Sequence, residues 1–191
     1  MKKFLLPLLA VLSLAGCVSQ PSNTVAVNPP IALPHQDPTL MGATIAISSS
    51  DQRPQPYVAM VRRGEGKPEP LYASRDLRFL MQEVLEKQMQ KRGYMLGTTG
   101  QATLEIIPIE IYADVTEGNL RHNITTKAKI RVITRTPKGE MVKEYRATYN
   151  VQGPLGAKNE DISKALNEVL KSVISDMAQD DSINTYIRQN S

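Results

Sequence analysis

The chain has 191 residues, 41% of them apolar, with 23 Lys and Arg side chains against 19 Asp and Glu. Its formal net charge of +4 is too small to indicate a nucleic-acid-binding protein. With two histidines and one cysteine, the chain has no internal disulfide and cannot build a zinc cluster from His and Cys, so we expect no metal and no cofactor.

The first sixteen residues are typical of a bacterial lipoprotein signal peptide. Two lysines precede an apolar stretch over residues 4–14, which is about half the length that spans a bilayer. The stretch ends in Leu-Ala-Gly-Cys, a lipobox, so we expect cleavage after residue 16 and a diacylglycerol and palmitate on Cys17. Val18 rather than Asp follows, and the similarity to sorted bacterial lipoproteins implies that the absence of Asp favours the outer membrane, facing the periplasm. The alternative is an ordinary secretory cleavage site that leaves a free thiol.

Residues 17–41 are interpreted as the lipidated N-terminus and a proline-rich tether. Five prolines stand among Ser, Asn and Gln with little apolar periodicity. Such a tether would let the folded domain stand away from the membrane. The alternative is that residues 25–33 pack on the domain as an irregular strand.

Residues 42–191 are predicted to form a single α+β globular domain. Residues 42–48 alternate apolar and polar side chains, and residues 57–61 and 69–73 flank a glycine-containing turn that is typical of a hairpin. Three longer strands are expected at residues 102–113, 122–136 and 141–152. Because short turns join these three strands, an antiparallel meander is favoured.

The long strands are predicted to form a sheet with one dry face and one wet face. The second and third strands alternate apolar and polar side chains with a period of two. In the first strand the apolar phase slips at Pro108, which indicates an edge position or a bulge.

Two long helices are predicted from apolar side chains that recur at three and four residues. The first spans about residues 74–92, with Ser74 as its N-cap and Gly93 at its end, and the second spans about residues 160–178. A short third helix would begin at Ser182. Because each apolar stripe needs a partner, we expect a two-layer sandwich in which the helices cover one face of an antiparallel sheet.

The wet face carries the best candidates for binding an anionic partner. These candidates are Lys127, Lys129, Arg131, Arg135 and Arg146. On two neighbouring strands their side chains would share one plane and attract an anionic glycan, a phospholipid or an acidic protein. The alternative is an ordinary solvated face, because Glu144 lies among them and alternating lysines also protect a sheet from edge pairing.

No catalytic motif stands out in the sequence. Asp37, Asp51, Asp76 and Asp114 lie near element ends and would have to converge to cleave a glycan. Acids at caps and turns are usually structural, so we expect a protein that is not an enzyme. The favoured function is an accessory or interaction module of the envelope, with an envelope protein or peptidoglycan as partner. A cell-wall hydrolase that uses carboxylates and a small-lipid carrier are the alternatives.

Seven short segments together carry a family resemblance: residues 36–42 (QDPTLMG), 73–80 (ASRDLRFL), 82–88 (QEVLEKQ), 92–94 (RGY), 112–115 (YADV), 145–147 (YRA) and 149–151 (YNV). With these segments the chain resembles the YajG family of bacterial lipoproteins. The similarity runs from the lipobox to residues 187–190. It implies a bacterial envelope lipoprotein without assigned catalytic residues, and the family's gene often lies beside one for a muropeptide permease, which points towards the cell wall.

Overall fold

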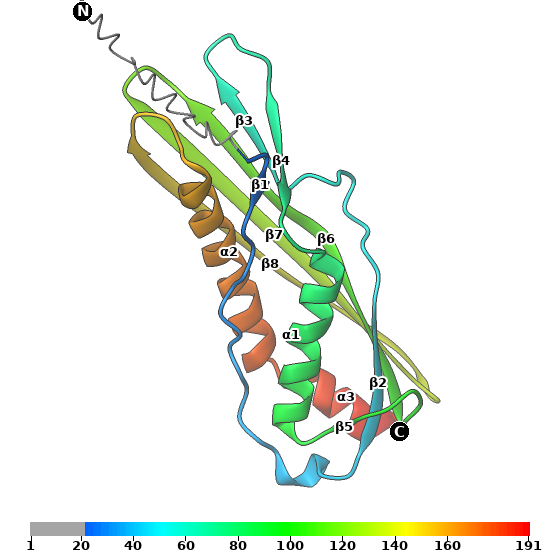
Figure 1. The fold of residues 1–191 in the computed structure, drawn as a ribbon. Helices are drawn as coiled ribbons and strands as arrows, with labels where there is room; N and C mark the ends of the chain where they lie inside the picture. Colours follow the sequence, from blue (N-terminus) through cyan, green and yellow to red (C-terminus); the bar gives the residue numbers. More distant parts are fainter. Residues whose placement is uncertain (1–21) are drawn as a thin grey trace, which may run out of the picture.

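A computed structural model describes residues 22–191 as a mixed α/β fold, with a large open sheet and two long helices (Figure 1). In chain order the elements are β1 (Thr24–Val25), the 3-10 helix η1 (Pro38–Leu40), β2 (Thr44–Ser49), β3 (Ala59–Arg63), β4 (Glu69–Ala73), α1 (Leu77–Arg92), β5 (Met95–Leu96), β6 (Ala102–Glu117), β7 (Arg121–Thr136), β8 (Gly139–Pro154), α2 (Asn159–Gln179) and α3 (Ser182–Asn190).

The sheet is arranged around β6. Strand β6 pairs antiparallel with β7, and β7 pairs antiparallel with β8, which confirms the predicted meander. On the other side of β6, β2 pairs in parallel with its first part and β3 in parallel with its last part. The sheet is therefore mixed, and the prediction of an antiparallel sheet was wrong for these strands. Helix α1 intervenes before β6 in the chain, and a helical crossover returns the chain in the same direction.

Pro108 lies where β6 passes from one parallel partner to the other. Pairing with β2 ends at Ile106 and pairing with β3 begins at Ala113. Against β7, the register shifts between Pro108 and Glu110. The predicted bulge is confirmed, whereas the edge position is not, because β6 has neighbours on both sides. Between Ile106 and Ala113 neither β2 nor β3 pairs with β6, and a proline is tolerated on this side of the strand because no ladder hydrogen bond is lost there.

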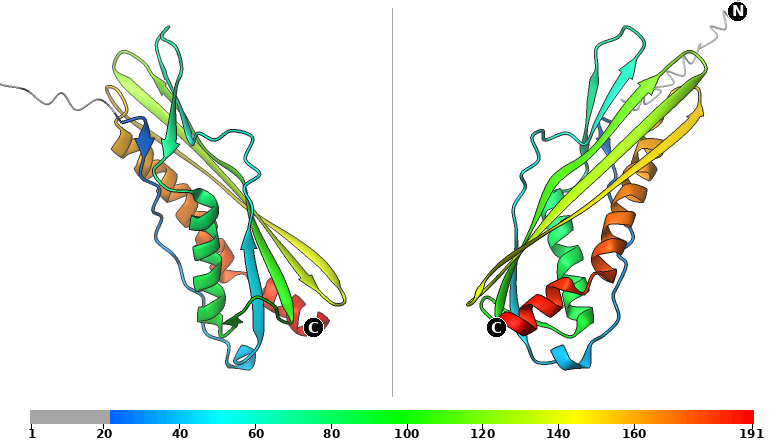
Figure 2. Two further views of the ribbon diagram at one scale, coloured as in Figure 1. Left: turned by 45° about the vertical axis from the view of Figure 1, so that its right-hand side comes forward. Right: turned by 180° about the vertical axis from the view of Figure 1, so that it is seen from behind.

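Helices α1 and α2 lie on the same side of the sheet (Figures 1 and 2). Helix α2 packs on β6, β7 and β8, while α1 packs on β2 and β6. The predicted apolar stripe of α2 is buried throughout, and it consists of Ile162, Ala165, Leu166, Val169, Leu170, Val173, Ile174 and Met177. In β7 every second side chain from His122 to Thr134 is buried against this layer, which confirms the predicted dry face.

The ends of the long helices agree with the prediction within three residues. Helix α1 begins at Leu77, because the carboxylate of Asp76 accepts a hydrogen bond from the backbone N–H of Arg78 at 2.8 Å. Ser74, the predicted cap, instead donates its backbone N–H to the segment that carries β1. Gly93 ends the helix as predicted, with a φ of 122° that favours glycine.

Residues 22–41 pack along the domain. Strand β1 pairs with β4, and the side chains of Val25 and Val27 are 2% and 0% exposed. The backbone N–H of Asn28 donates to Oδ1 of Asn167 in α2 at 2.8 Å. Prolines suit this segment, because it runs beside the helices with few ladder hydrogen bonds to lose.

For residues 22–41 this packing differs from the predicted tether, whereas residues 17–21 of that prediction lie outside the described residues. The alternative, in which residues 25–33 pack on the domain, is the arrangement that the structure shows. The predicted signal peptide and Cys17 lie outside the described residues. Within the described chain, no helix is both long and apolar enough to span a bilayer.

Candidate functional site

The face of the sheet opposite the helices carries all five predicted basic side chains. Lys127, Lys129, Arg131 and Arg135 alternate with the buried positions of β7, and Arg146 of β8 pairs in register with Lys129. Seen from behind, strands β6 to β8 lie in front of α1 and α2 (Figure 2). The side chains therefore share one face, which we call the outer face.

Glu144 forms ion pairs with three cations at the centre of the outer face. Its carboxylate lies 3.0 Å from Nζ of Lys129, 2.8 Å from Nη2 of Arg131 and 3.2 Å from Nη2 of Arg146. Hydrogen bonds from Arg131 and Lys129 lower the pKa of Glu144 to about 2. Three cations hold this carboxylate in its charged form, so Glu144 lowers the positive charge at the centre of the face without cancelling it.

The remaining basic residues of the outer face differ in their partners. Arg135 contacts Glu105 at 3.1 Å and Glu140 at 2.9 Å. Lys127 is exposed and forms no ion pair with any residue of the described chain. The outer face is thus a surface of mixed charge, on which Lys127 is the most available cation.

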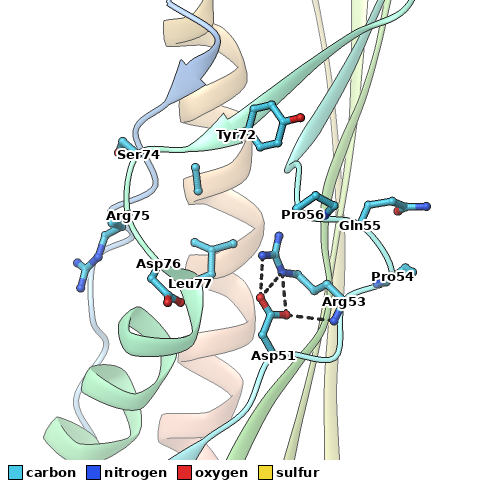
Figure 3. A pocket seen from close by; sticks show the side chains of 11 residues that line it. Asp51, Arg53, Pro54, Gln55, Pro56, Tyr72, Ser74, Arg75, Asp76 and Leu77 are labelled. Carbon is cyan, nitrogen blue, oxygen red and sulfur yellow. Dashed lines mark hydrogen bonds and ion pairs between the residues drawn. The ribbon is translucent and has the colours of Figure 1, made fainter.

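A pocket of about 620 Å³ lies between the β2–β3 loop and the start of α1 (Figure 3). Asp51 and Asp76 both line it. Arg53 donates to both carboxylate oxygens of Asp51, with Nη2 at 2.8 Å from Oδ2. Partial burial raises the pKa of Asp51, but the hydrogen bonds and charge of Arg53 outweigh it and hold the pKa below its ordinary value. Asp51 is therefore the charged partner of an arginine, and Asp76 is a helix cap.

The other two acids lie elsewhere. Asp114 of β6 forms an ion pair with Arg62 of β3. Asp37 caps η1 by accepting the backbone N–H of Thr39 at 2.9 Å, and it also contacts Arg188 at 3.4 Å. The four acids that the sequence suggested therefore do not converge on one site.

Arg53 is a residue that sequence reasoning missed. Its side chain is 10% exposed, and its Nη1 atom is buried without a hydrogen-bond partner in the described chain. It also lines a second pocket of about 480 Å³, on the side of Tyr57 and Tyr112. A lone arginine in a proline-containing loop carries no sequence signal of burial.

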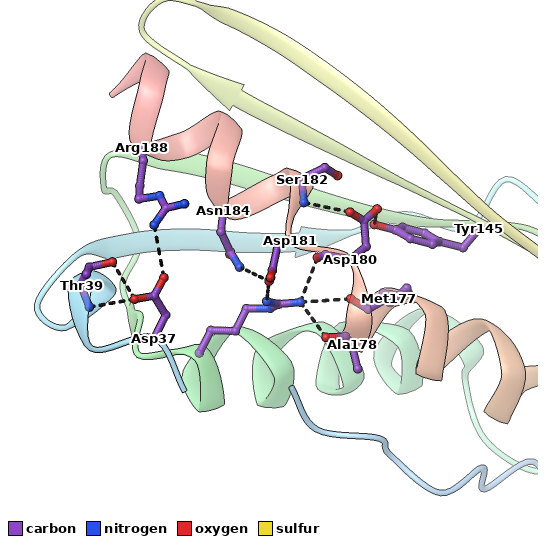
Figure 4. A network of polar contacts seen from close by, with 11 residues as sticks. Asp37, Thr39, Tyr145, Met177, Ala178, Asp180, Asp181, Ser182, Asn184 and Arg188 are labelled. Atoms are coloured by element: carbon purple, nitrogen blue, oxygen red, sulfur yellow. Dashed lines mark hydrogen bonds and ion pairs between the residues drawn. The ribbon is translucent and has the colours of Figure 1, made fainter. Parts of the chain in front are cut away.

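A second missed residue is Arg92, which joins α1 to the end of α2. It is 4% exposed, and its Nη2 donates to the carbonyl oxygens of Met177, Ala178 and Asp180 at 3.3, 2.8 and 2.9 Å. It also forms an ion pair with Asp181, in the network of Figure 4. The last carbonyls of a helix have no helical partners, so Arg92 caps α2 from outside. Its role is structural.

The described residues contain no group of three or more His, Cys, Asp and Glu side chains placed to hold a metal ion. The geometry of this part of the chain thus consists of ion pairs, helix caps and one broad polar face.

Comparison with known proteins defines the class of protein and then the family. A family model described as "Uncharacterized lipoprotein" matches residues 29–188, so the chain belongs to this family of lipoproteins. It is 52% identical over 190 residues to the uncharacterized lipoprotein YajG of Escherichia coli strain K12, covering 99% of this chain and 98% of the relative. The same protein of strain CFT073 matches equally. The resemblance to the YajG family is confirmed.

A solved structure shares the fold. Protein XCC0632 from Xanthomonas campestris superposes with a TM-score of 0.53 over 87% of this chain and 98% of its own. At 10% identity, this likeness concerns the fold alone.

Proposed function

We propose that this lipoprotein is anchored in the outer membrane by acyl chains on Cys17, faces the periplasm and acts as a non-enzymatic interaction module of the envelope. The lipobox and the family support the anchor. The outer face is the observation that carries the interaction role. Strands β7 and β8 each have 16 residues, and Figure 2 shows no helix in front of them in the view from behind.

The outer face suits a negatively charged partner that contacts it over a broad area. Lys127 has no acidic partner in the described chain, and the side chain of Arg146 is 72% exposed. The paired charges of Lys129, Arg131 and Glu144 beside them supply hydrogen-bonding groups for an envelope protein or for peptidoglycan. Contacts of this exposed kind are screened over about 8 Å at physiological ionic strength, so binding should weaken with salt.

Charge reversal on the outer face tests this proposal. The variant is Lys127→Glu with Arg146→Glu, and the matched control is Lys91→Glu with Lys171→Glu, which makes the same change of charge on the helices. Full-length protein is assayed for co-sedimentation with purified peptidoglycan and for cross-linking in cells from a photoreactive residue at position 148. We expect loss of binding in the first variant alone. Equal binding by both variants would rule out the outer face.

A cell-wall hydrolase is the second candidate, because Asp51 and Asp76 line one pocket. A glycosidase needs one carboxyl group whose pKa is raised, so that it donates a proton. The lowered pKa of Asp51 argues against this role. Release of muropeptides by the wild type, and its loss in Asp51→Asn and Asp76→Asn, would establish the enzyme and contradict our proposal.

A small-lipid carrier is the third candidate. A pocket of about 400 Å³ lies between β8 and α2 and is lined in part by Tyr149, Val151 and Leu155. Its volume falls in the usual range for small-ligand sites, about 300 to 1,000 Å³. An acyl chain found by native mass spectrometry of protein extracted from membranes, in addition to the chains on Cys17, would favour the carrier.

A further inference from the structure

Two leucines project together from one end of the domain. Leu120 in the β6–β7 turn is 77% exposed and Leu155 after β8 is 67% exposed, the highest fractions among the large apolar side chains of residues 22–191. The backbone N–H of Leu155 donates to the carbonyl oxygen of Leu120 at 3.0 Å, so the two residues are neighbours. Together they form an apolar tip, which we call the leucine tip.

The backbone of Leu155 adopts a strained conformation. Its φ is 58°, and it is the one non-glycine residue of the described chain with a positive φ. Side chains with a Cβ disfavour this region, and Gly156 follows directly. The carbonyl oxygen of Leu155 lies 3.0 Å from Nδ1 of His122, so hydrogen bonds on both sides hold the conformation. Such strain is often kept at functional positions.

The N-terminal segment reaches the domain at the same end. The carbonyl oxygen of Ser22 accepts a hydrogen bond from Nδ2 of Asn159 at 2.7 Å, and Asn159 is the first residue of α2, four residues after Leu155. Figure 1 shows β1, the start of α2 and the tip of the β6–β7 hairpin at this end. Five residue steps separate Ser22 from Cys17, and they span at most about 18 Å.

We propose that the leucine tip inserts into the phospholipid leaflet to which the acylated Cys17 attaches the protein. This inference rests on the proposed anchor. Arg121 directly follows Leu120, and Lys158 lies three residues after Leu155. Both cations are exposed and form no ion pair with any residue of the described chain, so they are available to lipid phosphates.

A membrane fits the leucine tip better than a protein partner does. A stable protein interface buries at least about 1,000 Å² in total, which two leucines and their neighbours do not provide. A lipid anchor in the same chain keeps the local concentration of the membrane very high, so even a small apolar tip stays inserted.

Insertion of the leucine tip sets the direction of the sheet. Strand β8 has 16 residues and ends beside Leu155, so at about 3.4 Å per residue its first residue, at the far end, lies about 50 Å along the strand from the leucine tip. Val142, which is 50% exposed, lies towards that far end. The outer face would then stand upright on the membrane, within reach of a partner in the periplasm.

Fluorescence of the full-length lipidated protein in vesicles tests this orientation. Cys17 is the only cysteine and its thiol is consumed by lipidation, so Leu120→Cys, Leu155→Cys and Val142→Cys each provide a single site for an environment-sensitive dye. The vesicles contain phosphatidylethanolamine and phosphatidylglycerol, with and without doxyl-labelled lipid. We expect a blue shift and several-fold stronger quenching at positions 120 and 155 than at position 142.

Two results would overturn the proposal, and they can be told apart. Equal, weak quenching at all three positions, while the protein still floats with the vesicles, would remove the leucine tip from the membrane and leave the anchor intact. Failure of the lipidated protein to float would remove the anchor and the insertion together. As a control for folding, Leu155→Gly should keep the thermal transition of the wild type and weaken quenching of the dye at position 120.

Discussion

Arg92 links three segments of the chain through one buried guanidinium group. Its side chain is 4% exposed, and its Nη2 donates hydrogen bonds to backbone carbonyl oxygens at the end of α2. We expect Arg92→Ala to lower the free energy of unfolding by about 2 to 4 kcal/mol, since buried carbonyls lose their donor.

Urea denaturation measures this loss. Lys91→Ala is the control, because Lys91 precedes Arg92 and is exposed, so its change should stay within about 0.5 kcal/mol. An equal effect of both substitutions would show that the guanidinium contributes little.

Glu144 predicts how stability depends on pH. Its pKa is about 2 in the folded protein against an ordinary value of 4.5, so between these values the unfolded chain binds more protons. Its contribution to stability is therefore present in full above pH 4.5 and is lost as the pH falls towards 2.

The variant Glu144→Gln should show a thermal transition that falls less steeply than that of the wild type over this acid range. Glu65→Gln is the control, because Glu65 forms no ion pair with the described residues. If the thermal transition of Glu144→Gln depended on pH as steeply as that of the wild type, the lowered pKa of Glu144 would be contradicted.

At the scale of the elements, the antiparallel strand pairs could be predicted from the sequence and the parallel pairs could not. The meander of β6, β7 and β8 follows from turns of a few residues and from strict alternation, both of which are local. The parallel pairs of β2 and β3 with β6 have no such signal, since the partners are far apart in the chain. Periodicity reports which face is buried and does not report which strand lies beside it.

The stripe of α2 supports a prediction at this scale. Leu166 is 0% exposed in the layer between α2 and the sheet. We expect Leu166→Ala to lower the free energy of unfolding by about 2 to 5 kcal/mol, because it removes buried methyl groups and leaves a cavity. Leu33→Ala makes the same change at a side chain that is 53% exposed and should cost far less. Similar losses in both variants, measured by denaturant titration, would show that the stripe is not core.

At the scale of the whole molecule, the few residues between Cys17 and Ser22 limit how the domain can be placed on the membrane. A free segment over residues 18–41 would hold the domain loosely, whereas packing from Ser22 onwards leaves four residues between the predicted acylation site and the fold. The anchor is therefore expected to restrict both the distance and the orientation of the domain.

Substitution of the predicted acylation site tests the anchor directly. We expect Cys17→Ala to abolish acylation, so that the protein becomes soluble or keeps its signal peptide. Metabolic labelling with palmitate and sucrose-gradient separation of the membranes provide the measurement. A variant that still takes up the label, or still sediments with outer membranes and enters a detergent phase as the wild type does, would disprove lipidation at Cys17.

The residues by themselves determined the family, the two long helices, the meander and its two faces. Each of these follows from neighbouring residues: short segments similar to the YajG family, an apolar stripe at three and four positions, or alternation between short turns. The placement of all five basic residues on one face was predicted for the same reason.

Only the tertiary structure decided the mixed direction of the sheet, the packing of residues 22–41 and the leucine tip. Each depends on segments far apart in the chain, as when Ser22 meets Asn159. During folding, each segment can pair with many distant segments. The apolar periodicity within one segment does not predict which of these partners it packs against in the folded protein.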